Sequence, residues 1–362
     1  MRRVAAVLAG SVLVVAGCGG GGGGDGDAEV VPVPPGTTVL PSSRAVMVIV
    51  GGSRTPSLAA GAGSEIVRDS TGLVDPGEIF IMLRDPITGS DPLVLPAGGG
   101  TASSPLSRLN RFRASAGGTV LDPVGESASL ALAAIRHAGW QALDDAARGP
   151  TSARLNHGEP RSNALFTADG LRDRIIAQHG GVDVPDAVAY YEDIASDHGE
   201  PAMDQLWNTV YHRLPMMRHR ARSAGYGDMA LARTRFPAAG VPVDDPWGNP
   251  GGNGYATINW TESRTPIIQT SVWPADGQSG VPGRFSTDTE SPDPASRAVG
   301  FAGERDDVGP VLHAILPTGA AFAAVRIEVS LDADPAWTLT ATTAAPASEV
   351  FTTGPHRFTV GP

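Results

Sequence analysis

The sequence predicts a mixed α/β (α+β) protein, with helices in the middle of the chain and short strands on either side of them. Apolar residues recur at helical spacing over 203–210. Before this region, short apolar runs at 45–50 and 79–83 are bounded by turn residues, as buried strands are. Near the end, apolar and polar residues alternate over 325–329, which indicates a strand with one buried face.

The composition predicts long loops around a modest core and argues against a nucleic-acid partner. The chain has 362 residues, with 46 Gly, 31 Pro and only 6% aromatic residues, and is long enough for one large domain or two ordinary ones. Its formal net charge is -11, whereas phosphate binding needs a basic face. The short run Arg218, Arg220 and Arg222 is interpreted as a solvated surface.

The N-terminus has the pattern of a secretory signal that ends in a lipidation site. Arg2 and Arg3 precede an apolar run over 4–16, which is too short for a mature membrane-spanning helix. The run ends in Val-Ala-Gly-Cys18, which resembles the lipobox of bacterial lipoproteins. Cys18 is the only cysteine, so no disulfide within the chain can form, and a free thiol is the alternative to lipidation. We expect residues 1–17 to be removed and a lipid on Cys18 to anchor the protein to a membrane outside the cytoplasm.

The remaining segments outside the middle region are a tether and two β-rich pieces. Residues 18–44 are rich in Gly and Pro and cannot bury a core, so they predict a tether. Glycine rather than aspartate follows Cys18, which favours the outer membrane or the cell surface. Residues 45–104 predict a short β segment with loops, either a separate domain or added strands of the main sheet. Residues 283–362 predict a small C-terminal β extension.

Several polar residues in the middle region are candidates for a site. The helix predicted at 127–145 carries His137 on or beside its apolar face. A histidine in that place is more often a packed core residue than a ligand. His157 and Glu159 share a loop that ends in proline. Glu192 lies in an otherwise apolar run, and a buried carboxylate needs a partner. His212 follows the amphipathic stripe of 203–210, so it is expected near a buried edge.

Taken together, these segments resemble a bacterial member of the CAP superfamily, which includes cysteine-rich secretory proteins, antigen 5 and pathogenesis-related-1 proteins. The order and spacing agree over residues 105–282, which we interpret as a CAP (SCP-like) domain. The five segments that carry the resemblance are Leu109–Ala114, Asn156–Glu159 with Phe166–Thr167, Tyr191–Ala195, Leu206–Arg213, and Pro274–Gly277 with Val281–Pro282.

The resemblance implies a three-layer α-β-α sandwich with a central cleft lined by two histidines and one or two acidic residues. Position by position, the histidines are His157 and His212 and the acid is Glu192. The chain departs from the family pattern at Asp193, where asparagine is usual. It also lacks a clear second acid beside His212.

Asn208 and Thr209 occupy the place of that second acid. Glu159 and Asp204 are the alternatives, although the helical stripe turns Asp204 away from the core.

Two imidazoles and a carboxylate with an open position would suit a divalent metal such as zinc. The other interpretation is that Glu192 only hydrogen-bonds the histidines and holds its loop to the sheet. The sequence contains no H-E-x-x-H, no nucleophile elbow, no phosphate-binding loop and no cysteine pair. No residue is therefore assigned a catalytic role, and any catalysis would use water activated by a metal or a histidine in the cleft.

Two functional hypotheses follow, and they belong to different classes. The first is an anchored lipoprotein whose CAP domain binds a lipid or another envelope component without chemistry. The second is a metal-dependent hydrolase that acts on an envelope polymer or peptide. Neither hypothesis involves nucleic acid.

Overall fold

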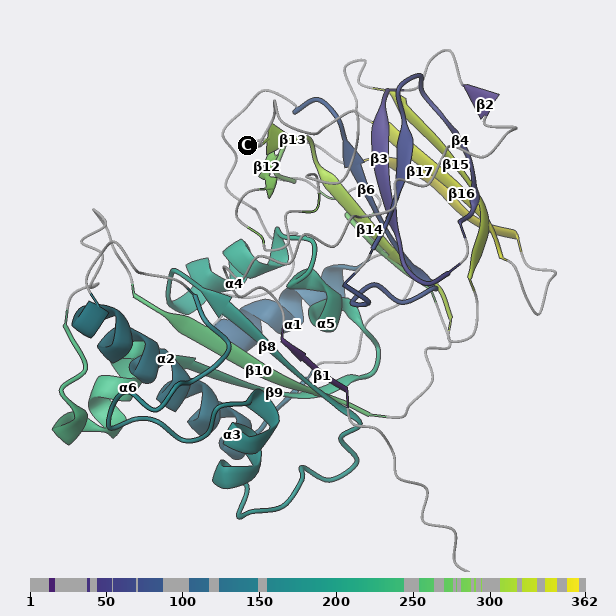
Figure 1. Ribbon diagram of the computed structural model, residues 1–362. Helices are drawn as coiled ribbons and strands as arrows, with labels where there is room; N and C mark the ends of the chain where they lie inside the picture. Colours follow the sequence, from purple (N-terminus) through teal and green to yellow (C-terminus); the bar gives the residue numbers. More distant parts are fainter. Residues whose placement is uncertain are drawn as a thin grey trace, which may run out of the picture.

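The computed structural model contains helices and mixed β-sheets, which confirms the predicted α/β class. It describes residues 13–16, 38–39, 44–53, 55–69, 71–86, 104–116, 124–148, 155–243, 254–263, 270–275, 278, 281–287, 290, 294, 307–317, 321–330, 336–343 and 350–357. Cys18, most of the predicted signal and tether, and the Asp276–Gly277 turn lie outside these residues. Two units can be distinguished in Figure 1, an α/β unit and a β-sandwich.

The α/β unit is built on a five-stranded sheet. Its three long strands, β8 (Ala189–Ala195), β10 (Ala256–Glu262) and β9 (Ala221–Asp228), are antiparallel neighbours in that order. Two short strands flank these three, β1 (Leu13–Ala16) parallel to β8 and β7 (Gly125–Glu126) parallel to β9, and β1 belongs to the segment that the sequence predicts to be removed. The burial pattern explains why these segments form a central sheet, because every residue of β8 and β10 is buried.

Helices cover both faces of this sheet (Figure 1). On one face lie α2 (Ala128–Arg148), α3 (Leu171–Gln178), α6 (Met229–Arg235) and the short η1 (Pro237–Ala239). On the other lie α1 (Pro105–Ser115), α4 (Gly199–Trp207) and α5 (Arg213–Met217).

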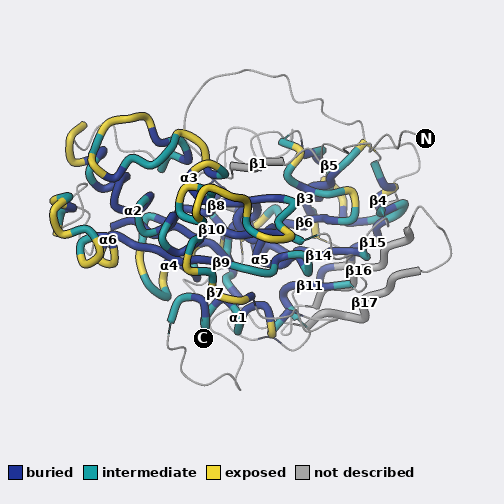
Figure 2. Tube along the Cα trace, turned by 90° about the horizontal axis from the view of Figure 1, so that it is seen from below, coloured by how far each residue is buried: buried dark blue, intermediate teal, exposed yellow. Residues whose placement is uncertain are grey.

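Two glycines of β9 set how closely α2 approaches the sheet. A Cβ at Gly225 would lie 2.0 Å from the backbone nitrogen of Ala131, and one at Gly227 would lie 2.1 Å from that of Ile135. Only glycine allows this contact between helix and strand backbones. Figure 2 shows the result, with the central strands buried and the exposed chain concentrated in loops around α2, α3 and α6.

The β-sandwich is formed by strands from both ends of the chain. One sheet has the order β11 (Ser271–Trp273), β14 (Val311–Ile315), β6 (Glu78–Leu83), β3 (Val46–Val50), β5 (Glu65–Arg68). The other has the order β17 (Val350–Arg357), β16 (Ala336–Thr343), β15 (Phe322–Ser330), β4 (Ser57–Ala60), β2 (Thr38–Val39). A two-stranded ribbon pairs β12 (Phe285–Ser286) with β13 (Asp307–Val308). The described strands of 45–104 therefore pair with strands of the C-terminal segment and not with the central sheet.

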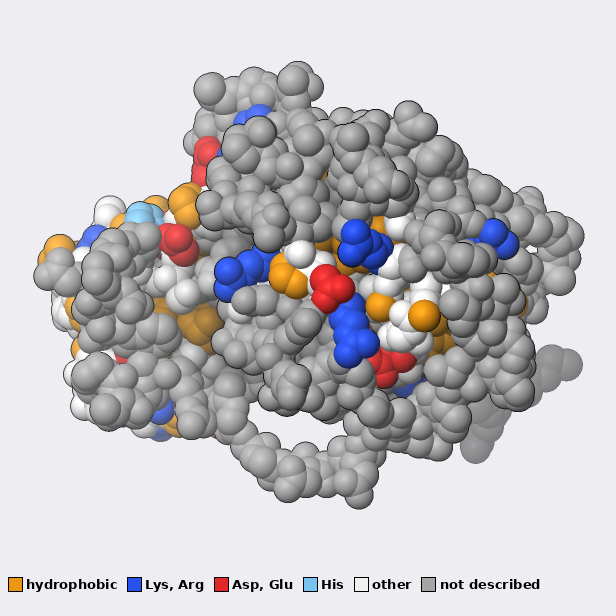
Figure 3. Space-filling model, turned by 90° about the horizontal axis from the view of Figure 1, so that it is seen from above, with side chains coloured by type: hydrophobic (Ala, Val, Ile, Leu, Met, Phe, Trp, Pro, Cys, Tyr) orange, Lys and Arg blue, Asp and Glu red, His pale blue; other side chains and the backbone are white. Residues whose placement is uncertain are grey.

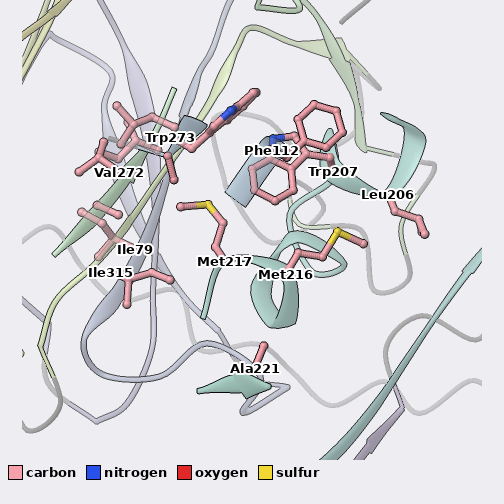
Figure 4. Packing of buried hydrophobic residues seen from close by; sticks show 14 of the residues in the cluster. Ile79, Phe112, Leu206, Trp207, Met216, Met217, Ala221, Val272, Trp273 and Ile315 are labelled. Atoms are coloured by element: carbon pink, nitrogen blue, oxygen red, sulfur yellow. The ribbon is translucent and has the colours of Figure 1, made fainter. Parts of the chain in front are cut away.

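Two hydrophobic clusters contain residues of both units. Met47, Phe80 and Val311 on one face of the sandwich pack against Val210 and Tyr211, which follow α4. A second contact is aromatic, because Trp207 of α4 stacks on Phe112 of α1 at 4.8 Å and meets the edge of Trp273 of β11 at 6.0 Å. Figure 4 shows these rings close to Met217 of α5. The loop after α4 is therefore held from both sides.

A buried ion-pair cluster joins the units, and it corrects one interpretation of the sequence. Arg218 is not a solvated residue, because its side chain is only 2% exposed. Its guanidinium donates to both carboxylate oxygens of Glu78 in β6 at 2.7 Å, and it lies 3.4 Å from Glu262 of β10. Arg220 extends the cluster to Asp75 at 2.6 Å and to Glu262 at 3.4 Å. Arg218 and Arg220 of the short arginine run therefore lie at the interface between the two units.

Removing the carboxylate from the centre of this cluster should lower the free energy of unfolding. In Glu78→Gln the Arg218 charge stays buried without its fork partner, and we expect the free energy of unfolding to fall by about 3 kcal/mol. Arg172 donates to Asp183 in a similar fork whose side chains are 35% and 47% exposed, so Arg172→Gln is a matched control that should cost less than about 1 kcal/mol. Urea denaturation measures the loss of stability in both variants. Equal losses would contradict the conclusion that the buried Glu78–Arg218 pair stabilises the protein more than an exposed pair does.

Candidate functional site

Glu192 is held by two partners on the α2 and α3 side of the central sheet. Arg174 of α3 donates from Nη2 to both of its carboxylate oxygens at 2.7 Å, and Nδ1 of His157 lies 3.0 Å from Oε1. Arg174 also donates from Nη1 to the backbone oxygen of His157 at 2.7 Å. Through Arg174, α3 thus holds both β8 and the loop that carries His157. The structure therefore brings together two of the three residues predicted to hold a metal, His157 and Glu192.

The two secondary candidates belong to the same cluster. His137 of α2 places Nδ1 2.8 Å from Oε1 of Glu159 and Nε2 3.6 Å from Oε1 of Glu192. Glu159 also accepts a hydrogen bond from the backbone nitrogen of Thr167 at 3.1 Å. Both His137 and Glu159 have fully buried side chains. We call His137, His157, Glu159, Arg174 and Glu192 the α2–α3 cluster.

Charges within the α2–α3 cluster favour an ionised Glu192, and burial favours a neutral His157. Burial alone would raise the pKa of Glu192, but the charges of Arg174 and His137 and the hydrogen bond from His157 outweigh it and hold that pKa well below its usual range. Burial lowers the pKa of His157, and its contact with Glu192 opposes this only in part. A neutral ring that donates from Nδ1 to a carboxylate keeps its lone pair on Nε2. Within the described residues, that buried Nε2 has no hydrogen-bond partner.

His212 lies in the opposite helical layer, at the junction of α4 and α5. Its Nδ1 is 2.9 Å from Oγ1 of Thr209 and 3.4 Å from Oε1 of Glu290. Glu290 also accepts a hydrogen bond from the backbone nitrogen of Tyr211 at 2.7 Å. His212 still affects His157 electrostatically, because its charge lowers the pKa of His157.

Glu290 supplies the acid that the sequence did not place beside His212. It comes from the C-terminal segment, far along the chain, and no motif marks it, so it could be found only from the fold. Neither alternative named from the sequence occupies this position. Glu159 belongs to the α2–α3 cluster, and Asp204 forms an ion pair with Arg108 at the α1–α4 surface, where its side chain is 27% exposed.

Asp193 and Glu192 have opposite roles although they are neighbours in β8. Asp193 accepts a hydrogen bond from Nε1 of Trp260 at 2.8 Å and is 2% exposed. Burial raises the pKa of Asp193 to about 7, against the opposing effects of His212 and Trp260. This carboxyl group therefore titrates near neutral pH. The alternation of side chains along a strand explains why one acid reaches Arg174 and the other does not.

The described residues contain no group of three or more His, Cys, Asp or Glu side chains that could hold a metal ion. His157 and Glu192 lie together, but His212 is bonded in the other layer and both oxygens of Glu192 already accept from Arg174. The geometry is that of a buried polar network whose main acid is neutralised by an arginine. Among the described residues, three buried nitrogens of the cluster have no hydrogen-bond partner: Nε2 of His157, Nε2 of His137 and Nε of Arg174.

Comparisons with known proteins add no family assignment to this geometry. No protein-family model matches the chain, and neither the curated proteins nor the solved structures contain a match.

Replacing Asp193 with asparagine should stabilise the protein above neutral pH. The folded-state pKa is raised, so the folded protein binds more protons than the unfolded chain between about pH 3.8 and 7, and stability is lost as the pH rises through this window. Asparagine can still accept from Trp260 but carries no charge. We expect Asp193→Asn to gain up to about 4 kcal/mol at pH 8 and almost nothing at pH 4.

Thermal or urea unfolding across this pH range measures the gain. Asp173→Asn, a change at an exposed position of α3, is the control and should show no such pH-dependent gain. A gain for Asp193→Asn that is the same at both pH values would contradict the charge argument.

Proposed function

We propose that this chain is a lipid-anchored envelope protein whose CAP-like domain binds a ligand without performing chemistry on it. The observation that carries the proposal is the fork between Arg174 and Glu192, in which both carboxylate oxygens accept at 2.7 Å. A carboxylate held in this way is not free to bind a metal or to take a proton from water. Freeing it would leave a buried guanidinium unpaired, which typically costs about 3–5 kcal/mol.

The sequence order of the elements supports the CAP-like part of the proposal. The segments that resemble the family lie on α1, on the loop before α3, on β8 and at the end of α4, and helices cover both faces of the sheet that contains β8. The charge distribution supports a partner other than nucleic acid. On the face in Figure 3, described basic and acidic side chains lie next to one another and form no continuous basic field.

Metal content and hydrolytic activity test the absence of chemistry. We expect the purified chain to contain zinc far below one ion per molecule, because both carboxylate oxygens of Glu192 already accept hydrogen bonds from Arg174. We also expect His157→Ala and His212→Ala to leave any hydrolysis of peptide or envelope-polymer substrates unchanged. His198→Ala, at a side chain that is 49% exposed, is the matched control. Near-stoichiometric zinc in the wild type that is lost in His157→Ala and in His212→Ala but not in His198→Ala would overturn the proposal.

A metal- or histidine-dependent hydrolase is the second candidate, and one observation favours it. Nε2 of His157 is buried without a hydrogen-bond partner among the described residues, and a neutral imidazole nitrogen can accept a proton from water. The same variants decide between the candidates, since hydrolysis that is lost in His157→Ala and kept in His198→Ala would establish the enzyme. Extraction of the purified chain with organic solvent tests the ligand-binding function, because a bound lipid would be recovered and identified.

Membrane attachment is proposed to depend on Cys18. Within the described part of the chain, the structure contains no helix that is both long enough and apolar enough to cross a membrane. The attachment that the sequence supports is a lipid on Cys18, because the preceding segment resembles a lipobox. We expect Cys18→Ser to move the protein from the membrane fraction to the soluble fraction, as detected by immunoblotting after fractionation. Ser11→Ala, a change within the apolar run, should leave attachment intact, and membrane retention of Cys18→Ser would refute the anchor.

A further inference from the structure

A pocket of about 670 Å³ lies at one end of the central sheet, and no residue of the α2–α3 cluster lines it. Its walls come from three segments, the turn 185–188 before β8, Arg222–Ser223 at the start of β9, and Thr261–Ser263 at the end of β10. This volume is in the range of small-molecule sites, which is about 300–1,000 Å³. The pocket belongs to the α/β unit alone.

The backbone around this pocket is irregular at two points. The register between β9 and β10 shifts at Thr261/Glu262, and such bulges occur often beside binding sites. Asp186 has φ of 61°, and it is the one residue other than glycine with positive φ in the described part of the chain. Both irregularities bring polar residues to the wall of the pocket.

The polar lining is rich in hydroxyl groups. Ser223 and Thr261 are register partners on adjacent strands, so their side chains lie side by side on one face of the sheet, and Ser263 adds a third hydroxyl. Each hydroxyl both donates and accepts hydrogen bonds. A ligand that also carries several hydroxyls would match this lining.

The lining carries little net charge. It contains two carboxylates, Asp186 and Glu262, and one guanidinium, Arg222, and Arg218 and Arg220 outside the lining neutralise Glu262. This small net charge disfavours a strongly charged ligand. The lining includes only three apolar residues, Pro185, Ala187 and Val188, which is too little for an acyl chain, and the described lining offers no aromatic ring on which a base could stack.

We propose that this pocket binds an uncharged, hydroxyl-rich ligand, a saccharide of one or two rings. The inference rests on the proposed ligand-binding function and assigns that function a site and a chemical class. It places binding at the end of the sheet, away from the buried histidines.

Isothermal titration of the purified full chain with maltose, cellobiose and the N-acetylglucosamine disaccharide tests the proposal. We expect at least one of them to bind in the millimolar range or tighter. Thr261→Val removes one hydroxyl at nearly constant shape, and it should weaken binding about threefold to tenfold. Thr257→Val is the matched control, because Thr257 is a buried threonine of the same strand outside the pocket, and it should bind like the wild type.

Asp186→Asn provides a second variant at an exposed turn, where asparagine also tolerates positive φ, so the fold should persist. It should weaken binding by a similar factor. The inference is overturned if none of the three sugars binds, if Thr261→Val and Asp186→Asn bind like the wild type, or if glycine or palmitate binds in the pocket instead.

Two outcomes separate the inference from the function on which it rests. Sugar binding that is lost in His157→Ala but kept in Thr261→Val would overturn this site while leaving a ligand-binding function in place. Cleavage of a disaccharide by the wild type would overturn the non-catalytic function itself.

Discussion

The position of the β-sandwich relative to the α/β unit depends on the buried guanidinium of Arg218. It donates to Glu78 of the sandwich and, at 3.0 Å, to the hydroxyl of Tyr191 in the central sheet. Burial lowers the pKa of Arg218, but Glu78 and Glu262 raise it well above its ordinary value, so the residue stays charged. Because an unpaired charge is so costly inside a protein, neither unit can shift without the other.

This constraint determines what surrounds the two histidines. The sandwich covers the loop after α4, so His212 is 5% exposed and lies 3.4 Å from Glu290 of the C-terminal segment. On the other face, α2 and α3 enclose His157 and its partners. The central sheet thus separates two buried polar groups, and among the described residues His212 acts on His157 through its charge. These contacts do not favour a single cleft that contains both His157 and His212.

Local patterns predicted most of the elements, but contacts between distant segments could not be predicted. The strands at 45–50 and 79–83 and the helix near 127–145 appear as β3, β6 and α2, because period and turn residues are local signals. Motif order predicts that His157, Glu192 and His212 lie together, and the structure brings His157 and Glu192 into contact while His212 lies beside Thr209. Arg174 was missed because an arginine in a short helix looks exposed, and Arg218 was placed on the surface because its acidic partner lies far away in sequence.

The pairing of the first strands with the last ones has a consequence for how the chain folds during synthesis. β3 and β6 emerge early, yet β6 needs β14 as its neighbour, and β4 needs β15. Pairing over such sequence separations is slow, because a long loop must close before any contact stabilises it. Until the ribosome has passed these late strands, the early ones carry unpaired hydrophobic edges, which is the state in which β-rich chains aggregate.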